Sequence, residues 1–486
     1  MSNTTVNKIF SDVIAILKKY TIRDALDFSF DFSLDRDLYV RSIDIDEREC
    51  ADKLIPWALE VFLKLSLIYC KQEFERNPSL DKGELNFVIR EIALWQLKFQ
   101  NNLRNHKYIY MKNYIKYLER DSIEDPIFDI YRHYCYFTSD KEIYDKFIDK
   151  FNSLYDRFVE FALYFDFSHK VRNNFKSNFR DKLEKYRDLF DLLSCNIIDA
   201  RNSYSDNQDQ LSLIYLRTRF DIHSYPILKF EESYIIPLYY MIKHSIGNIL
   251  MFKFTYECKD LPHIVGKLLR ENYLYKIVND SKCYKQIWTE KQVESLTNGC
   301  GISDVIATDG NKIVFLDSKS TYLYFDVLNL NDDAIKEHKK ELVKYLEQMY
   351  KHIFKHCVKE QVYKTFLPKQ YNVDDVYGII VMRDFTIIKQ EIIFDEVCQK
   401  LNITDSNHIK WMRKHIAFLD IYSVEQIVFG GDSLIDFMKQ TEDQMASNNK
   451  LNVRLSCYKT KKVIYKDYIE FFNLIKRRIA TLSCQD

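Results

Sequence analysis

Three charged residues near the middle of the chain have types and spacing that could do chemistry together: Asp304, Asp317 and Lys319. Two carboxylates close to one another can share a hard divalent cation, whereas without an ion they repel and one tends to stay protonated. An ammonium group beside them can orient a water molecule or stabilise developing negative charge. The three can act together only if the elements that carry them bring them to one face.

The segment that carries these residues is predicted to be a β-hairpin. Two β-type runs, 303–308 and 312–320, flank Asp309-Gly310, and Asp-Gly between apolar runs favours a two-residue type I′ turn. That turn sets Asp304 opposite Phe315, so that the two motif aspartates are diagonal neighbours, about 7–8 Å apart. Because side chains alternate along a strand, the lysine shares their face. Both faces are apolar near the turn, which predicts a sheet covered on both sides.

Asp304, followed by Asp317-Ser318-Lys319 at the end of a buried strand, resembles the motif of the PD-(D/E)XK, or restriction-endonuclease-like, nuclease superfamily. Ser303 stands where that superfamily usually has a proline. The resemblance covers about residues 225–390, where the order helix, hairpin, helix and strand matches the α-β-β-β-α-β core of the superfamily. It implies that both aspartates and the Ser318 carbonyl bind the metal ion and that Lys319 is catalytic.

A further site residue, Glu271, is expected on a helix over Leu261–Val278. It falls within the apolar stripe of that helix, where a carboxylate is costly unless a cation or a donor meets it. Members of the superfamily often supply a glutamate from the helix before the hairpin, so the resemblance implies that Glu271 is a third acidic ligand. The alternative is that Glu271 lies at the margin of the stripe and pairs with Lys267 or Lys276. The stripe consists of Ile264, Leu268, Tyr275 and Val278.

The resemblance implies an endonuclease that hydrolyses phosphodiester bonds of nucleic acid with Mg²⁺ or Mn²⁺, DNA being favoured over RNA. By analogy it also implies an antiviral defence or restriction effector, regulated through its helical part by a protein partner or by homo-oligomer formation. The alternative is a catalytically inactive nuclease-like protein that binds nucleic acid or serves as a scaffold. Retention of all three motif charges favours the enzyme, because a site freed from catalysis has no physical reason to keep buried charges.

The 486 residues suffice for two or three domains, and only 9 Gly and 7 Pro favour long helices. The predicted fold class is α+β, mostly α overall. Residues 1–220 are expected to form a helical interaction or sensing domain, 221–394 a restriction-endonuclease-like α/β core with a small mixed sheet, and 395–486 a helical extension. The polar stretch Asn202–Gln210 is expected near the first boundary, and Tyr225–Pro237 is predicted to be a second hairpin.

Several individual elements follow from hydrophobic periodicity. A long helix over Ala334–Val358 is expected to begin at a cap formed by Asn331-Asp332-Asp333. Its lysines at 336, 340, 344 and 351 either face a phosphate backbone or form a solvated face. Val376–Met382 is predicted to be a buried strand. Helices are expected over Ala58–Tyr69, Phe87–Phe99, Tyr144–Phe165 and Trp411–Leu419.

Composition excludes several other kinds of protein. The formal net charge is zero, so local basic patches would have to hold a polyanion. The 11 cysteines contain no C-x-x-C pair, which predicts neither a zinc ribbon nor a disulfide framework. His352, His356 and Cys357 could be metal ligands, but no further ligands accompany them, which favours a packed or solvated helix face. The absence of a signal peptide and of an uninterrupted apolar span predicts a cytoplasmic protein with no membrane contact.

Overall fold

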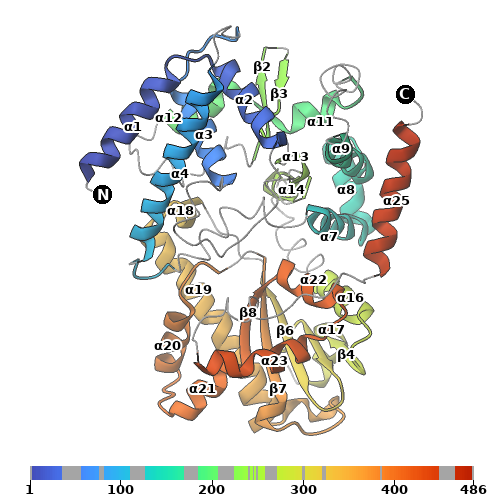
Figure 1. The fold of residues 1–486 in the computed structure, drawn as a ribbon. Helices are drawn as coiled ribbons and strands as arrows, with labels where there is room; N and C mark the ends of the chain where they lie inside the picture. Colours follow the sequence, from blue (N-terminus) through green and yellow to red (C-terminus); the bar gives the residue numbers. More distant parts are fainter. Residues whose placement is uncertain are drawn as a thin grey trace.

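The protein is mostly α-helical and contains two small mixed sheets, which confirms the predicted fold class (Figure 1). None of the helices that the structure describes is long and apolar enough to cross a membrane. The computed structural model describes residues 3–35, 56–75, 81–104, 106–109, 126–168, 184–205, 224–231, 233–238, 241–244, 246–247, 250–257, 271–297, 301–319, 325–383, 386–447 and 466–483.

Helices build the N-terminal part of the chain. The predicted helices over Ala58–Tyr69 and Phe87–Phe99 are confirmed, whereas the one over Tyr144–Phe165 is two helices, α8 and α9. Asn152 separates them with a left-handed backbone (φ 48°), a conformation that commonly ends a helix. The helices are α1 (Asn3–Leu17), α2 (Ile22–Asp35), α3 (Pro56–Tyr69), α4 (Lys82–Arg104), α7 (Pro126–Thr138), α8 (Lys141–Phe151), α9 (Tyr155–Ser168), α11 (Arg187–Leu192) and α12 (Ile197–Ser205).

The predicted hairpin over Tyr225–Pro237 is confirmed as β2 (Ile227–Phe230) and β3 (Ser233–Ile235). It lies in a three-stranded sheet with β1 (Ser194–Asn196), which pairs with β2 in parallel, and not in the sheet that carries the motif. This small sheet therefore joins strands from both sides of the boundary expected near residue 220. The division into three domains stays a prediction. Two helices follow, α13 (Met241–His244) and α14 (Leu250–Glu257).

The motif lies in a five-stranded sheet of order β4-β5-β6-β7-β8, at the opposite end of the molecule from α1–α4 (Figure 1). The first three strands are antiparallel, and β7 and β8 continue in parallel to β6. Every residue of β5, β7 and β8 is buried, which confirms a sheet covered on both faces. The strands are β4 (Gln286–Thr289), β5 (Val305–Thr308), β6 (Ile313–Lys319), β7 (Val376–Met382) and β8 (Ile416–Asp420).

Two strands of this sheet differ from the sequence prediction. β4 lies in a stretch for which no strand was predicted. β8 replaces the C-terminal half of the helix predicted over Trp411–Leu419, because α21 ends at His415. A short apolar run does not show by periodicity whether it is a buried helix or a buried strand, and here pairing with β7 decides it. The sheet consequently draws its last strand from beyond residue 394.

Helices and short turns of helix connect and cover the strands. α19 packs on β7, and α23 packs on β6. Asn331 caps α19 as predicted, because its side chain accepts from the N–H groups of Asp333 and Ala334. The elements are α16 (Asn272–Asp280), α17 (Glu290–Val293), η5 (Glu294–Leu296), α18 (Phe325–Leu328), α19 (Asp332–Tyr350), η6 (Lys351–Lys359), η7 (Val362–Thr365), η8 (Val373–Asp375), α20 (Gln390–Lys400), α21 (Ser406–His415), α22 (Ile421–Phe429) and α23 (Leu434–Ser447). The last helix, α25 (Lys466–Ser483), packs instead on α7 and α9 (Figure 1).

The predicted helix over Ala334–Val358 changes type partway along. α19 ends at Tyr350 and η6 continues as a π-helix, in which the Glu360 N–H donates to the Lys355 carbonyl five residues earlier (2.9 Å). The helix approaches the sheet closely at Gly378 of β7, where an added Cβ would lie 2.6 Å from Met349 Cγ and Sδ. Long π-helical stretches are rare and often occur at functional sites.

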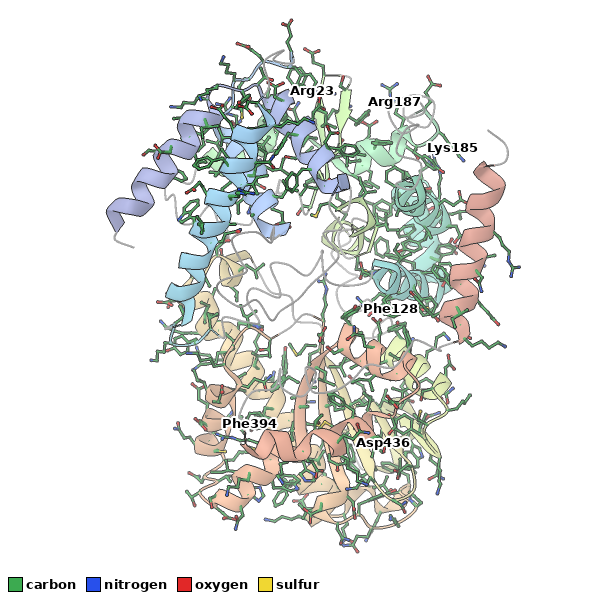
Figure 2. All side chains as sticks on the ribbon, in the orientation of Figure 1. Arg23, Phe128, Lys185, Arg187, Phe394 and Asp436 are labelled. Atoms are coloured by element: carbon green, nitrogen blue, oxygen red, sulfur yellow. The ribbon has the colours of Figure 1, made fainter. Side chains whose placement is uncertain are left out.

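A buried ion pair joins the N-terminal helices to the sheet. Arg132 of α7 donates two hydrogen bonds, each 2.7 Å long, to the carboxylate of Glu425 on α22. Glu425 also accepts from the Tyr273 hydroxyl of α16 (2.7 Å), and Arg132 pairs with Asp129 (3.0 Å). Phe128, labelled in Figure 2, packs beside this network, and its ring contacts Tyr422, Phe429 and Tyr468.

Removing one partner of this ion pair should strongly destabilise the fold. Arg132→Met leaves Glu425 buried without its cation and should lower the free energy of unfolding by about 3–5 kcal/mol. The double variant Arg132→Met/Glu425→Leu should lose less than the sum of the two single variants. Lys146→Met, which breaks an exposed pair with Glu142, should cost about 0.5 kcal/mol or less. Urea unfolding measures the free energy of unfolding of Arg132→Met, Glu425→Leu, the double variant and Lys146→Met. A loss in the double variant equal to the sum of the two single losses would contradict coupling between Arg132 and Glu425.

Candidate metal centre

The register of the motif hairpin differs from the prediction by two residues. Thr308 pairs with Ile313 and not with Asn311, so the loop has four residues. Side chains select the longer loop: the Thr308 hydroxyl donates to the Lys312 carbonyl (2.6 Å), and Asp309 Oδ1 accepts from the N–H groups of Asn311 and Lys312. Because the shift is by two residues and side chains alternate with period two, every side chain keeps its predicted face.

The corrected register aligns three carboxylates across neighbouring strands. Continued by one residue, the β5–β6 pairing sets Asp304 directly opposite Asp317 and not diagonal to it, about 4.5–5.5 Å apart at Cα. The β4–β5 pairing, continued likewise, sets Glu290 opposite Asp304, and the Glu290 N–H donates to the Asp304 carbonyl (3.1 Å). Glu290, Asp304 and Asp317 thus form one row at the end of the sheet.

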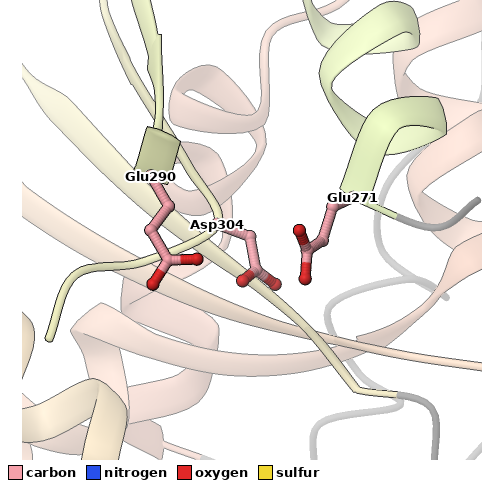
Figure 3. A group of neighbouring side chains, drawn as sticks. All are labelled: Glu271, Glu290 and Asp304. Carbon is pink, nitrogen blue, oxygen red and sulfur yellow. The ribbon is translucent and has the colours of Figure 1, made fainter. Parts of the chain in front are cut away.

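Asp304 lies between Glu290 and Glu271, and the three carboxylates point toward one another (Figure 3). Their oxygens lie within 4.8 Å of one another. The structure therefore brings Glu271 to Asp304 as expected and adds Glu290, which sequence reasoning missed. The signal for Glu290 was weak: it directly follows the short run Gln286–Thr289, and only recognition of that run as a strand would have placed it in the row.

Glu271 lies near Asp304 because it directly precedes α16, as the N-cap residue of that helix. Its backbone dihedrals are helical (φ −61°, ψ −47°), and the buried residues Leu274 and Val278 follow it at i+3 and i+7. Glu271 thus precedes the buried face of α16, whereas residues 261–270 of the predicted helix, with Ile264 and Leu268 of its stripe, lie outside the described residues, and Tyr275 is only half-buried. In the alternative pairing, Lys267 lies outside the described residues, and Lys276 forms ion pairs with Asp280 (2.5 Å) and Asp467 (2.8 Å).

The Asp304 carboxyl has a strongly raised pKa. Burial, followed by the negative charges of Asp317 and Glu271, raises its pKa to about 8, against the lowering effect of the Ser318 N–H and of Lys319. The Ser318 N–H donates to Asp304 Oδ2 at 2.6 Å. Metal binding by the Ser318 carbonyl stays a prediction. A carboxyl group that retains its proton among other carboxylates is expected at a centre that needs a cation to ionise fully.

Asp317 and Lys319 form an ion pair beside the acidic group. Asp317 is 1% exposed in its side chain, and its Oδ2 lies 3.5 Å from Lys319 Nζ. The ammonium group also donates to Gln348 Oε1 of α19 (3.2 Å) and lies over the Tyr345 ring, 5.3 Å from its centroid. These contacts hold the positive charge at the same edge of the sheet as the carboxylate row.

His352 is a second residue near the centre that the sequence did not place there. Its Nε2 lies 4.0 Å from Asp317 Oδ2, and its side chain is 5% exposed. His352, His356 and Cys357 were considered together as metal ligands. In the structure, His356 Nδ1 instead forms a hydrogen bond with Glu360 (3.2 Å), and Cys357 is buried. A packed or solvated helix face was the favoured interpretation, and His352 is packed. Its proximity to Asp317 depends on the docking of η6 against the sheet, which periodicity does not show.

The donor set fits a hard divalent cation. Mg²⁺ and Mn²⁺ prefer carboxylate oxygens, and Glu271, Glu290 and Asp304 offer one oxygen each within a single cluster. Among the residues that the structure describes here, the carboxylates of Glu271, Glu290, Asp304 and Asp317 outnumber the ammonium group of Lys319, which makes the centre attractive to a cation.

The lysine row of α19 gives little support to phosphate binding. Lys336, Lys340 and Lys351 form ion pairs with Asp333, Glu337 and Glu347, at 2.8, 2.5 and 2.7 Å. Each partner is three or four residues away along the same helical path. These contacts are typical of a solvated helix face, which was the second of the two interpretations.

No protein-family model, curated protein or solved structure matches the chain. The function is therefore argued from the geometry of the centre.

The raised pKa of Asp304 should make the metal-free protein less stable as pH rises. The folded state retains this proton up to about pH 8, whereas the unfolded chain loses it near pH 4. Between these values the unfolded state binds fewer protons, so the free energy of unfolding falls with increasing pH. Asp304→Asn, which keeps an acceptor for the Ser318 N–H, should show a smaller fall and be the more stable protein at pH 8.5. Urea unfolding in EDTA measures this, and equal pH slopes would refute it.

Glu271 and Glu290 should each contribute to cation affinity. Glu271→Gln and Glu290→Gln keep the side-chain shape but remove the charge, and each should weaken Mn²⁺ binding about tenfold or more. Glu337→Gln, at an exposed position of α19, is the control and should bind like the parent. Isothermal titration calorimetry gives the affinities. Unchanged binding by Glu271→Gln would assign that residue a structural role.

Proposed function

We propose that the protein is a divalent-metal-dependent endonuclease that hydrolyses phosphodiester bonds of nucleic acid. The observation that carries this proposal is the convergence of Glu271, Glu290 and Asp304 beside the Asp317–Lys319 pair at one edge of a buried mixed sheet. Carboxylates that gather a cation next to a held ammonium group suit a reaction in which negative charge develops on a phosphate.

The order and direction of the elements support the same proposal. α16 precedes the antiparallel strands β4, β5 and β6; α19 then leads to β7, which runs parallel to β6. This is the α-β-β-β-α-β order of the PD-(D/E)XK superfamily, with β4 as the strand that the sequence prediction lacked. Asp304 directly precedes β5, Asp317 and Lys319 lie on β6, and Glu271 directly precedes α16, a placement similar to that of the superfamily motif.

Each side chain has a distinct part in the proposed reaction. A bound Mg²⁺ or Mn²⁺ supplies Lewis acidity and lowers the pKa of a water molecule. Glu271, Glu290 and Asp304 would hold the cation, whose charge would favour the ionised form of Asp304. Lys319, fixed by Asp317 and by Gln348, orients the attacking water or stabilises the charge that develops on the phosphate.

DNA is the substrate that we propose in preference to RNA, on the resemblance alone. A role as a defence or restriction effector in the cytoplasm, regulated by a protein partner or by self-association, is part of the same proposal. The buried contact between Arg132 and Glu425 supports regulation through the helices, because it joins α7 to the helix bearing Tyr273 and Glu271.

Plasmid nicking tests the proposed activity. The parent should nick supercoiled DNA with Mg²⁺ or Mn²⁺ and not with EDTA. Asp317→Asn and Lys319→Gln should each lower the rate on the order of 100-fold or more, while thermal melting shows that they remain folded. Lys340→Gln, which removes an exposed lysine of α19, should nick like the parent.

Two results would overturn this assignment. Parent-like nicking by Asp317→Asn or Lys319→Gln would show that the reaction occurs elsewhere. Tight Mn²⁺ binding without cleavage of DNA or RNA would favour the inactive nuclease-like protein that binds nucleic acid or serves as a scaffold.

A further inference from the structure

Two buried acceptor atoms face one another at the edge of the carboxylate row. Asp317 Oδ2 and His352 Nε2 lie 4.0 Å apart, and neither has a hydrogen-bond partner among the described residues. The two side chains are 1% and 5% exposed. Buried polar atoms without a partner are rare in proteins and ask for an explanation.

Hydrogen bonding on the other side of the imidazole determines what Nε2 offers. The Tyr363 hydroxyl donates to the Gly301 carbonyl (3.1 Å), because a carbonyl oxygen can only accept. The hydroxyl oxygen then accepts from His352, whose Nδ1 lies 3.3 Å away. With the hydroxyl proton directed to Gly301, the neutral ring carries its proton on Nδ1, and in that tautomer Nε2 presents a lone pair toward Asp317.

A lone pair and a carboxylate oxygen cannot bond to each other. A cation, or a molecule that donates two hydrogen bonds, would satisfy both atoms if it lay between them.

The spacing suits a single metal ion. Bonds from a first-row transition metal to an imidazole nitrogen and to a carboxylate oxygen are each about 2.0–2.2 Å long, so one ion can contact donors up to about 4.2 Å apart. The observed 4.0 Å separation lies within that reach. Lys319 is the competing cation, since its Nζ lies 3.5 Å from the same oxygen, but it also contacts Gln348 and the Tyr345 ring.

We propose that Asp317 and His352 bind a first-row transition-metal ion through one carboxylate oxygen and one imidazole nitrogen. This inference rests on the proposed function and deepens it, because it places an ion with a nitrogen ligand at the Asp317 end of the carboxylate row. Mg²⁺ and Mn²⁺ both prefer carboxylate oxygens, but Mn²⁺, as a first-row transition-metal ion, also accepts an imidazole nitrogen, whereas Mg²⁺ keeps to oxygen ligands and water. The site therefore selects Mn²⁺ over Mg²⁺ as its working ion.

Pulsed electron paramagnetic resonance on the Mn²⁺-loaded full-length protein tests the nitrogen ligand directly. The parent should show a ¹⁴N coupling of a directly bound imidazole, and protein labelled with ¹⁵N-histidine should show a ¹⁵N coupling instead. His352→Gln should lose the signal. His356→Gln, four residues along the same helix and paired with Glu360, should retain it.

Labelled parent protein keeps this test decisive even if His352→Gln fails to fold. Bound Mn²⁺ without any nitrogen coupling would overturn the proposal and would indicate a bridging water. A coupling that persists in folded His352→Gln would overturn it as well, by assigning another ligand. Failure to bind Mn²⁺ at all would refute both this inference and the metal centre.

Calorimetry supplies a second readout that is separate from cleavage. In His352→Gln the ratio of Mn²⁺ to Mg²⁺ affinity should fall at least about tenfold. Lys319→Gln, which removes the competing cation, should raise Mn²⁺ affinity. An unchanged affinity ratio in His352→Gln would overturn the nitrogen ligand. If the parent protein shows the nitrogen coupling but does not nick plasmid DNA, the proposed nuclease activity is refuted and the proposed ion site is retained.

Discussion

The buried contact between Arg132 and Glu425 fixes how the helical part of the molecule meets the sheet. Glu425 is fully buried, and its carboxylate binds both Arg132 of α7 and the Tyr273 hydroxyl of α16. These helices cannot separate without leaving a charge buried and unpaired, which is far more costly than breaking an exposed pair. Tyr273 lies two residues after Glu271, so the helix that presents a candidate ligand is anchored by a residue from the first third of the chain.

The second constraint is the row of carboxylates across the sheet, whose mutual repulsion destabilises the folded state. Like charges on directly opposite residues of a sheet are destabilising, and here Glu290, Asp304 and Asp317 are adjacent across three strands. The structure offsets part of this repulsion with the Ser318 N–H, with Lys319 and with the proton that Asp304 retains. Such an arrangement is poorly suited to a purely structural role, because apolar side chains in the same row would stabilise the sheet.

Local pattern was sufficient to predict the motif strand and the strand over Val376–Met382. It also identified the face shared by the motif charges, since an error of two residues in register leaves alternation unchanged. The turn itself depended on side-chain hydrogen bonds of Thr308 and Asp309, which composition does not reveal. Glu290 and His352 were missed because their places are set by β4 pairing and by helix–sheet docking, which join residues distant in sequence.

Gly378 allows α19 and η6 to pack closely against the sheet, and this close packing affects the candidate site. An added Cβ there would lie 2.6 Å from Met349 and 3.4 Å from Ile353 Cγ2, so Met349 or the whole helix would have to move. Met349 follows Gln348, which holds Lys319, and Ile353 follows His352. Because glycine has no side chain, α19 and η6 can pack directly against the backbone of β7, and Gly378 therefore sets the distance between these helices and the sheet. An added Cβ at position 378 would therefore shift the Gln348 and His352 side chains relative to Lys319 and Asp317.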